Sequence, residues 1–351
     1  MRIPNIYSLI TVILFIEFLG CKDKGVGPLP EKNPREYSWT SDTLHFPGSY
    51  QTDMQNIWAS SPNDVYAVGF NTDGQPLWHY DGKTWTNVNL WGVYNIVTPQ
   101  LNSIYGFASN NVWAVGLKGY DYADSSLIIH YDGSKWSETN IVRGNRGLND
   151  IYGSSPNDIW ACGWGGTVYH YDGIKWNKDS ISIYNPQSAE FQLLSITESK
   201  NIVYIIGEKY ENTKGSTYYF LKKSNQSWQI IDSLVSGPGT FKWGTSLWTS
   251  PEGNLFSFRD GVFKWNGNGW DILFSEPYAL TSLAGTSEHS IFAVGNYGMA
   301  YHYNGSDWYQ FPKLKNENIK YTGVWTDGNE AFICGFTTDS YPMKTIVWHG
   351  K

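Results

Sequence analysis

The sequence predicts an all-β fold: a seven-bladed β-propeller with four-stranded antiparallel blades, the last of them closed by the N-terminal strand. Three observations support this prediction. Aromatic residues make up 17% of the 351 residues and charged residues 16%, which supplies a large core and is not typical of disorder. A pattern of short strands and turn residues recurs about every 45 residues. The last copy of this pattern stops before its fourth strand.

The repeat is clearest between Leu148 and Trp176, where turn signals separate four strands. A glycine ends the second strand in most copies, with a degenerate copy near Ser257; these glycines are Gly69, Gly116, Gly163, Gly207, Gly295 and Gly335. A tryptophan opens the fourth strand in six copies, at Trp85, Trp136, Trp176, Trp228, Trp270 and Trp308. Even spacing of this kind is typical of propeller blades.

The incomplete last repeat has a counterpart at the other end of the chain. A strand-like segment, Tyr37 to Phe46, precedes the first repeat and contains Trp39. Pairing this segment with the last repeat would complete its blade, close the ring and remove exposed sheet edges. We therefore expect one propeller domain over residues 37–351, monomeric in solution.

Local chemistry explains why the motifs recur. Pro156 stands in a Ser-Pro-Asn-Asp segment, where proline presets φ and Asn or Asp can bond the nearby backbone. Dipeptides such as Asp172-Gly173 suit hairpins, because glycine accepts positive φ. Cys162 and Cys334 occupy a position that valine fills in other repeats. We expect them to fill apolar core positions rather than to form a disulfide or bind a metal.

The segment 1–20 has the features of a signal peptide, with a positive charge at Arg2 and an apolar stretch from Leu9 to Leu19. This stretch is shorter than the roughly 20 residues that span a membrane. The segment ends Leu19-Gly20-Cys21, which resembles the lipobox of bacterial lipoproteins. The alternative is an uncleaved anchor in which the cysteine is incidental.

The lipobox resemblance implies that Cys21 becomes the acylated N-terminus of a lipoprotein, with palmitate-type chains that hold it at a membrane. Residues 21–36 are rich in Gly, Pro and charge and lack periodicity, so we expect a flexible tether. The expected location is the bacterial cell envelope, lipid-anchored at the outer membrane, either periplasmic or surface-exposed.

Two further resemblances concern the repeats. The segment Asn111 to Gly116, followed by His130 to Trp136, resembles the repeats of bacterial propeller lipoproteins, which read Asp-Val-Trp-Ala-Val-Gly and His-Tyr-Asp-Gly-x-x-Trp. This likeness covers residues 37–351. The turn Asp81 to Trp85 is similar to the Asp-box of sialidase-type and photosystem-assembly-factor-type propellers, but is one residue shorter and lacks the leading Ser. The Asp-box is a fold element and implies no activity.

Propeller topology places the second-to-third loops and the blade-to-blade connections on one face, and the repeated turns on the other. The loops vary among repeats, so we expect their face to encode recognition. Aromatic rings with a polar rim suit glycan stacking or a protein hot spot, although each ring could equally pack its own loop. The candidate ligand-binding residues are Trp91, Tyr94, Tyr120, Asp121, Tyr122, Arg143, Arg146, Trp164, Tyr210, Trp243, Tyr297 and Tyr341.

The sequence gives less support for an active site than for a binding surface. Four histidines share a third-strand position, but each belongs to a different blade, so they cannot converge on one metal ion and are expected to bond locally; they are His79, His130, His170 and His302. A sialidase needs several convergent arginines, whereas Arg143 and Arg146 share one loop. No metalloprotease, nucleophile-elbow or phosphate-loop motif occurs in the sequence. We expect no enzyme activity, no cofactor and no metal.

The net charge of −7, without a run of Lys or Arg, argues against nucleic-acid binding. The function that the sequence favours is a non-enzymatic binding or scaffold propeller, anchored to a membrane through Cys21, that recognises protein or glycan through its variable loops. Two alternatives stay open: an assembly factor for a membrane complex, and a divergent sialidase-like glycoside hydrolase.

Overall fold

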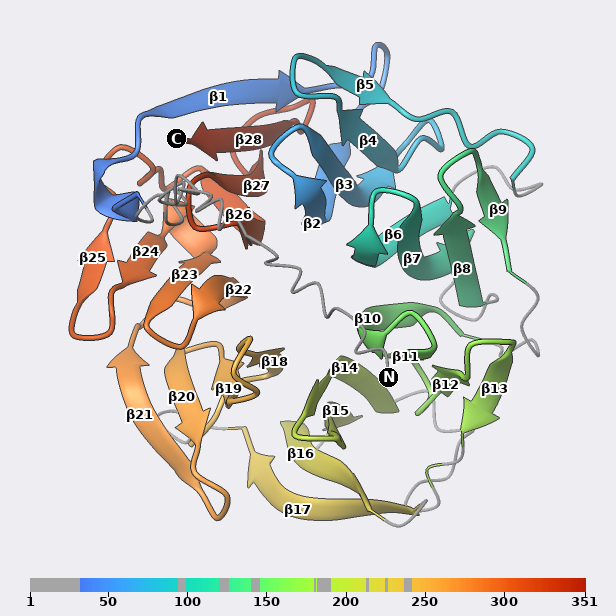
Figure 1. The fold of residues 1–351 in the computed structure, drawn as a ribbon, viewed down its shortest axis with the longest axis vertical. Coiled ribbons are helices and arrows are strands. Elements are labelled where there is room, and N and C mark those ends of the chain that lie inside the picture. The colour runs from blue at the N-terminus through green and yellow to red at the C-terminus, as the bar shows by residue number, and fades with distance from the viewer. Residues whose placement is uncertain are drawn as a thin grey trace, which may run out of the picture. The chain divides into compact units, whose positions relative to one another are not determined.

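The computed structural model describes residues 32–93, 99–119, 126–139, 146–179, 181, 191–212, 215–224, 227–236 and 242–351. These residues form seven four-stranded antiparallel sheets arranged as blades around a central axis (Figure 1). The predicted seven-bladed β-propeller is therefore confirmed. Within the described part of the chain, both helices are single 3₁₀ turns and no helix is long and apolar enough to cross a bilayer.

The blades follow the order of the sequence, each running from an inner first strand to an outer fourth strand. Blade 1 contains β2 (Thr52–Ser61), β3 (Asp64–Asn71), β4 (Leu77–Tyr80) and β5 (Trp85–Asn87). Blade 2 contains β6 (Pro99–Ala108), β7 (Asn111–Lys118), β8 (Ser126–Tyr131) and β9 (Trp136–Glu138). Blade 3 contains β10 (Leu148–Ser155), β11 (Asp158–Gly163), β12 (Val168–Tyr171) and β13 (Trp176–Asp179).

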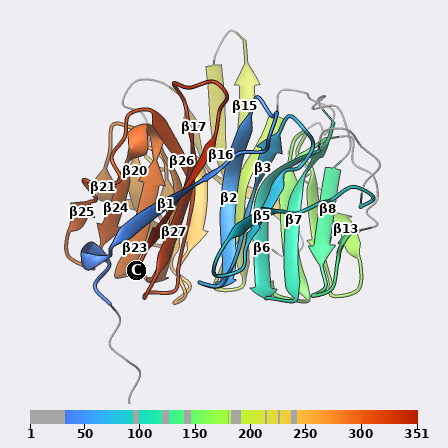
Figure 2. The same cartoon turned by 90° about the horizontal axis from the view of Figure 1, so that it is seen from above.

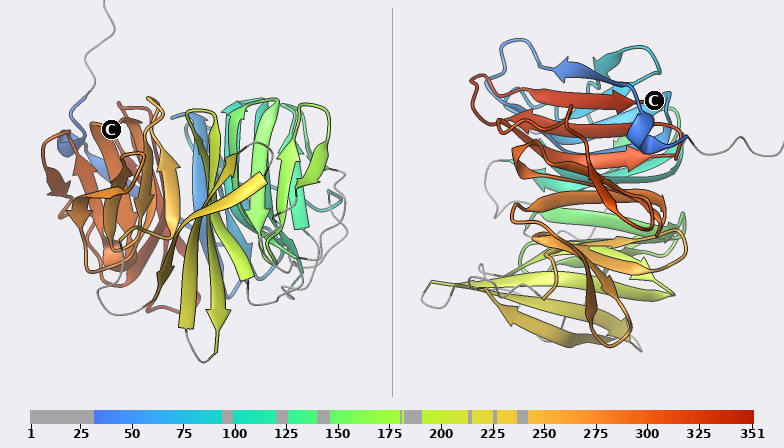
Figure 3. Two further views of the ribbon diagram at one scale, coloured as in Figure 1. Left: turned by 90° about the horizontal axis from the view of Figure 1, so that it is seen from below. Right: turned by 90° about the vertical axis from the view of Figure 1, so that its left-hand side faces the viewer.

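Blade 4 contains β14 (Phe191–Ser199), β15 (Ile202–Glu211), β16 (Gly215–Ser224) and β17 (Ser227–Val235). Blade 5 contains β18 (Ser246–Thr249), β19 (Leu255–Phe258), β20 (Gly261–Trp265) and β21 (Trp270–Ser275). Blade 6 contains β22 (Leu280–Ser287), β23 (Ser290–Gly295), β24 (Ala300–Tyr303) and β25 (Trp308–Gln310). The hairpin of β15 and β16 extends beyond its neighbours at one face of the ring (Figures 2 and 3).

Blade 7 is assembled from both ends of the described chain. It contains β26 (Ile319–Thr326), β27 (Ala331–Thr337), β28 (Thr345–Gly350) and, as its outer strand, β1 (Trp39–Leu44). The register runs from Trp39 opposite Gly350 to Leu44 opposite Thr345. The Trp39 ring is buried against Phe311, with ring centroids 5.4 Å apart. The predicted closure by the N-terminal strand is confirmed.

The propeller's contacts begin slightly before the predicted start at residue 37. Pro34–Glu36 form a 3₁₀ turn capped by Asn33. Arg35 donates to both carboxylate oxygens of Asp307, in the third-to-fourth turn of blade 6, and the Tyr37 hydroxyl donates to the Gly328 carbonyl in the first-to-second turn of blade 7. The described chain thus enters the propeller on the face that carries the repeated turns (Figure 2).

The glycine that ends the second strand in most blades has a steric cause. The first strands of most blades contain a register shift, for example between Met54 and Asn56. At this shift the backbone of the first strand comes so close that a Cβ on Gly69 would lie 2.1 Å from the Asp53 carbonyl oxygen, and one on Gly116 would lie 1.9 Å from that of Gln100. Only glycine fits there. Cys162 and Cys334 precede two of these glycines and are fully buried free thiols in different core clusters.

Candidate functional site

The second-to-third loops and the blade-to-blade connections form one face, here called the variable-loop face; the first-to-second and third-to-fourth turns form the opposite turn face. The predicted residues that the structure describes on the variable loops are Trp91, Arg146, Trp164, Tyr210, Trp243, Tyr297 and Tyr341. Five predicted residues lie outside the described residues: Tyr94, Tyr120, Asp121, Tyr122 and Arg143. Cys21 also lies outside them.

Exposed aromatic side chains are sorted to the variable-loop face. Among the described residues, six aromatic side chains are 43–78% exposed: Tyr50, Trp91, Tyr210, Tyr278, Tyr297 and Tyr341. All six lie in second-to-third loops, at their strand ends or in blade-to-blade connections. The repeated turns of the turn face instead expose an aliphatic residue, Ile174. Because clustered exposed apolar groups, unlike scattered ones, commonly mark interaction sites, this asymmetry makes the variable-loop face the candidate contact surface.

Four of these rings form two pairs over neighbouring blades. Tyr50, in the connection into blade 1, stacks on Tyr341 of the blade 7 loop, with centroids 5.6 Å apart and planes 13° apart. Tyr278, in the connection into blade 6, meets Tyr297 of the blade 6 loop edge-on at 4.7 Å. Tyr297 adopts a left-handed backbone conformation, with φ of 59°. Sequence reasoning missed Tyr50 and Tyr278, although each stands in a blade-to-blade connection.

The structure corrects one predicted contact residue. Trp243 is fully buried, packs on Phe220 and donates from Nε1 to the Asp232 carboxylate at 3.1 Å. It is a core residue between blades 4 and 5, so it offers no surface to a ligand. Trp164 is half-buried, forming a bridge with Gln192, and Arg146 is half-buried at the entry to blade 3.

The third-strand histidines are each held within their own blade, as predicted. The Nε2 atom of His79 lies 2.7 Å from Asp64 Oδ1, and that of His170 lies 2.6 Å from Asp158 Oδ1. Both imidazoles stack on a second-strand ring, as His170 does on Trp160 at 4.0 Å. His130 and His302 make the corresponding contacts with Asn111 and Ser290. Among the residues described, no group of three potential ligands is placed to hold a metal ion.

These histidines also set the ionisation of their carboxylate partners. Burial opposes the charge of Asp158, but hydrogen bonds from Ser154 and His170 outweigh it and hold the pKa of that carboxyl below its ordinary value. Asp64 has a lowered pKa for the same reasons, with His79 and Ser60 as donors. The ionised carboxylates thus form charge-assisted hydrogen bonds with the imidazoles, which join the second and third strands of a blade.

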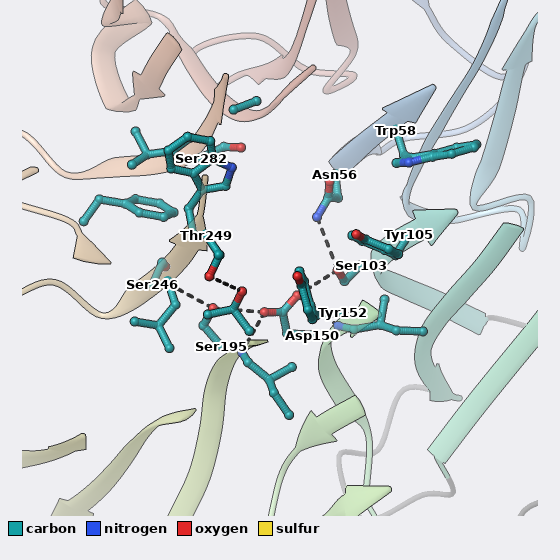
Figure 4. A pocket seen from close by; sticks show the side chains of 18 of the residues that line it. Asn56, Trp58, Ser103, Tyr105, Asp150, Tyr152, Ser195, Ser246, Thr249 and Ser282 are labelled. Atoms are coloured by element: carbon teal, nitrogen blue, oxygen red, sulfur yellow. Dashed lines mark hydrogen bonds between the residues drawn. The ribbon is translucent and has the colours of Figure 1, made fainter. Parts of the chain in front are cut away.

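A cavity of about 680 Å³ occupies the central channel. First-strand residues of all seven blades line it. Hydrogen bonds join neighbouring first strands in series from β22 through β26, β2, β6, β10 and β14 to β18, and Figure 4 shows the part of this network between Asn56 and Thr249. In four blades a side chain donates to a carbonyl of the next blade: Asn102 to Leu148, Asn149 to Leu193, Thr281 to Tyr321 and Thr322 to Met54. This network, called the ring of bonds below, holds these strands in register.

Asp150 is the carboxylate within this ring. Its two oxygens accept four hydrogen bonds, from the hydroxyls of Ser103 and Ser195 and from the backbone N–H groups of Ile151 and Ile196. Burial raises the pKa of the carboxyl despite these donors. Asp150 thus joins three blades, and its bonding capacity is used within the protein.

Comparisons with known proteins bear on the fold. No family model and no curated protein matches this sequence. Among solved structures, "YCF48 bound to D1 peptide" is similar with a TM-score of 0.61 and 17% identity, covering 92% of this chain and 98% of that one. YCF48 from Cyanidioschyzon merolae is similar with a TM-score of 0.59 and 15% identity over 87% of this chain and 98% of that one.

The WD40 propeller domain of Doa1 is similar with a TM-score of 0.57 and 14% identity, over 90% of this chain and 96% of that one. At these identities the likeness concerns the arrangement of strands. What the geometry and the comparisons together show is that the chain is a seven-bladed β-propeller.

Proposed function

We propose that this chain is a non-enzymatic protein-binding or scaffold propeller of the bacterial cell envelope, anchored through Cys21 and engaging a protein partner through the variable-loop face. The observation that carries the proposal is the placement of all six exposed aromatic side chains of the described residues on that face. Tyrosine and tryptophan are enriched at the centres of protein interfaces, where they bury large areas at a low entropic cost.

The two tyrosine pairs favour a protein partner. Each ring of a pair is already oriented by its neighbour, so binding orders few side chains. Trp91 lies in the connection that leaves blade 1, so exposed rings follow one another over blades 6, 7 and 1. A row of rings borne by three blades offers a long, shallow contact, which suits a protein surface better than one sugar.

The fold comparison supports the same class of partner. The YCF48 structure named above is described as bound to a D1 peptide, so a propeller of this shape can serve peptide recognition. The assembly-factor alternative is a special case of this proposal, in which the bound protein is a subunit of a membrane complex. No arrangement of the described residues favours the glycoside hydrolase, since Arg35 and Arg259 pair with Asp307 and Asp260 in different blades.

The test is capture of the partner by crosslinking in intact cells, followed by identification of the captured protein. We expect the double variant Tyr50→Ala/Tyr341→Ala to lose a specific partner that the wild-type chain captures, at unchanged chain abundance. Ile174→Ser, at an exposed position on the turn face, is the matched control and should retain it. Equal capture by wild type and the double variant would refute the proposal, as would binding of a glycan in place of a protein at the variable-loop face.

A further inference from the structure

We propose that the turn-face end of the central channel is a saccharide-binding site, separate from the variable-loop face. The cavity lining includes first-strand residues and the first-to-second turns of blades 4 and 5, among them Lys200 and Gly253. Both turns belong to the turn face, and no described residue of the second-to-third loops contributes to the lining. The described lining therefore reaches the turn face, opposite the face that carries the exposed tyrosine pairs.

Aromatic residues flank most of this opening. At equivalent positions near the ends of their first strands, five blades carry an aromatic residue that lines the cavity: Trp58, Tyr105, Tyr152, Trp248 and Trp325. Tyr105 and Tyr152 meet at a centroid distance of 5.3 Å, and the Trp58 ring lies against Gly106, where a Cβ would come within 2.6 Å of it. Figure 4 shows Trp58, Tyr105 and Tyr152 on one side of the channel.

The polar atoms of these rings have unused bonding capacity. No hydrogen bond joins the hydroxyls of Tyr105 or Tyr152, or Nε1 of Trp58 or Trp325, to another described residue. These atoms are also not among the fully buried polar atoms that lack a partner, so each keeps some exposure. Burial raises the pKa of Tyr105 to about 12, which keeps its hydroxyl protonated and able to donate. A ligand in the channel thus meets ring faces together with free donors.

Small residues interrupt this set of rings in two blades. Blades 4 and 6 carry Thr197 and Ala284 at the position that holds an aromatic ring in the other five blades. Thr249 follows Trp248 in blade 5, and its hydroxyl lies 2.9 Å from that of Thr197. The turn Lys200-Asn201 has positive φ at both residues, 52° and 63°, and is held by the Ser199 hydroxyl, which donates to the Gly253 carbonyl. The fixed turn places an ammonium and an amide at the rim.

These groups fit a neutral sugar ring. Aromatic faces stack on the C–H face of a pyranose, while hydroxyls, amides and an ammonium bond its hydroxyl groups. A volume of about 680 Å³ is within the range of small-molecule sites. The lining also holds two carboxylates: Asp150, whose oxygens are already satisfied, and Glu198, which can accept a hydrogen bond from a sugar hydroxyl.

A peptide backbone finds fewer partners in the channel, because the ring of bonds uses inward backbone groups. The N–H of Ile196 bonds Asp150, that of Leu247 bonds Ser195, and that of Val324 bonds Ser282. Peptides that bind sheets commonly use such free backbone groups. The channel therefore offers side chains, rather than an open strand edge, to its ligand.

The experiment is ligand-observed NMR with the purified full chain in a detergent that has no sugar headgroup. The probes are cellobiose, maltose and chitobiose, with the peptide tetra-alanine as the competing class. We expect at least one disaccharide to bind. The double variant Tyr105→Phe/Tyr152→Phe, which keeps both rings, should weaken that binding at least fivefold, and Trp58→Ala at least tenfold.

Tyr131→Phe is the matched control, because the Tyr131 hydroxyl bonds the Gly133 carbonyl in an outer turn, away from the channel. It should bind like the wild type. The inference is overturned if none of the three disaccharides binds, if tetra-alanine binds in their place, or if the Tyr105→Phe/Tyr152→Phe variant binds as tightly as Tyr131→Phe. Whether the Tyr50→Ala/Tyr341→Ala variant loses its protein partner has no bearing on disaccharide binding. Each of the two proposals can therefore fail without the other.

Discussion

At the scale of single residues, carboxylates at different depths of the propeller respond to pH in opposite directions. The Asp158 carboxyl is clamped by His170 and has a lowered pKa. Its contribution to stability is complete above the ordinary pKa of about 4 and is lost as the pH falls below it. Asp53 behaves in the opposite way, because burial raises its pKa to about 6 although Gln55 donates to it and Lys320 attracts it.

Replacing Asp53 should change the pH dependence of stability. The folded chain holds a proton on Asp53 up to a pH of about 6, whereas the unfolded chain releases it near 4, so this group makes the wild type less stable as the pH rises through that window. The shift of about two pKa units corresponds to roughly 3 kcal/mol. In Asp53→Asn this loss should disappear. Urea denaturation at pH 4 and pH 7 measures it, and the prediction fails if both proteins show the same difference in unfolding free energy.

At the scale of elements, the outer strands differ in how much their opening tryptophan contributes to the core. Trp176 is 4% exposed and meets Trp113 edge-on at 5.7 Å, whereas the corresponding rings at Trp85 and Trp308 are only half-buried. The sequence motif is the same in these blades. The blades differ in the side chains that neighbouring blades place against this tryptophan. The motif therefore predicts where the tryptophan lies in its blade, but not how deeply it is buried.

Truncating Trp176 should therefore be costly. We expect Trp176→Ala to lower the unfolding free energy by about 3–5 kcal/mol, because it leaves a cavity between two blades. The matched control is Trp91→Ala, since Trp91 is 59% exposed and its loss should change stability by less than about 0.5 kcal/mol. Chemical denaturation of both variants provides the measurement. A loss below about 1 kcal/mol for Trp176→Ala would contradict the packing described for blade 3.

The elements that could be predicted from sequence are those fixed by local rules. Turn residues such as Pro156 and Gly173 mark strand ends by their own backbone preferences, and the incomplete last repeat predicts the pairing of Trp39 with Gly350. Contacts between segments of different blades could not be predicted in this way. Tyr50 meets Tyr341, from the other end of the propeller sequence, and Trp243 turns inward to Asp232, because neighbouring blades decide where connections lie.

At the scale of the whole molecule, the two faces have different roles in the proposals above. Arg35 and Tyr37 fix the start of the described chain to the turn face, at Asp307 and Gly328. If Cys21 is the lipid anchor, as proposed, the anchor is joined to the propeller through this fixed segment. We expect the variable-loop face, with its tyrosine pairs, to be directed away from the membrane and toward a partner.

This orientation can be measured with a fluorescent thiol label and a quencher carried by the lipid. Cys162 and Cys334 are fully buried, so a label should react mainly with a cysteine introduced at the surface. We expect the label on Ile174→Cys, at the turn face, to be quenched more strongly than the label on Tyr210→Cys, at the variable-loop face. Cys21→Ser should abolish membrane attachment and both signals. Stronger quenching at position 210 would show that the molecule is oriented the other way.

The split blade has a consequence for biosynthesis. β1 is the first strand of the ring to leave the ribosome and β28 is the last, yet they are hydrogen-bonded neighbours, and Ser38 and Lys351 bond each other in both directions. The earliest strand therefore stays without its partner until translation of the ring is complete, and an interrupted chain would display both an unpaired strand and an open seventh sheet. Such a chain exposes surface that proteases and chaperones can bind, so quality control of this protein can act on a single, late docking event.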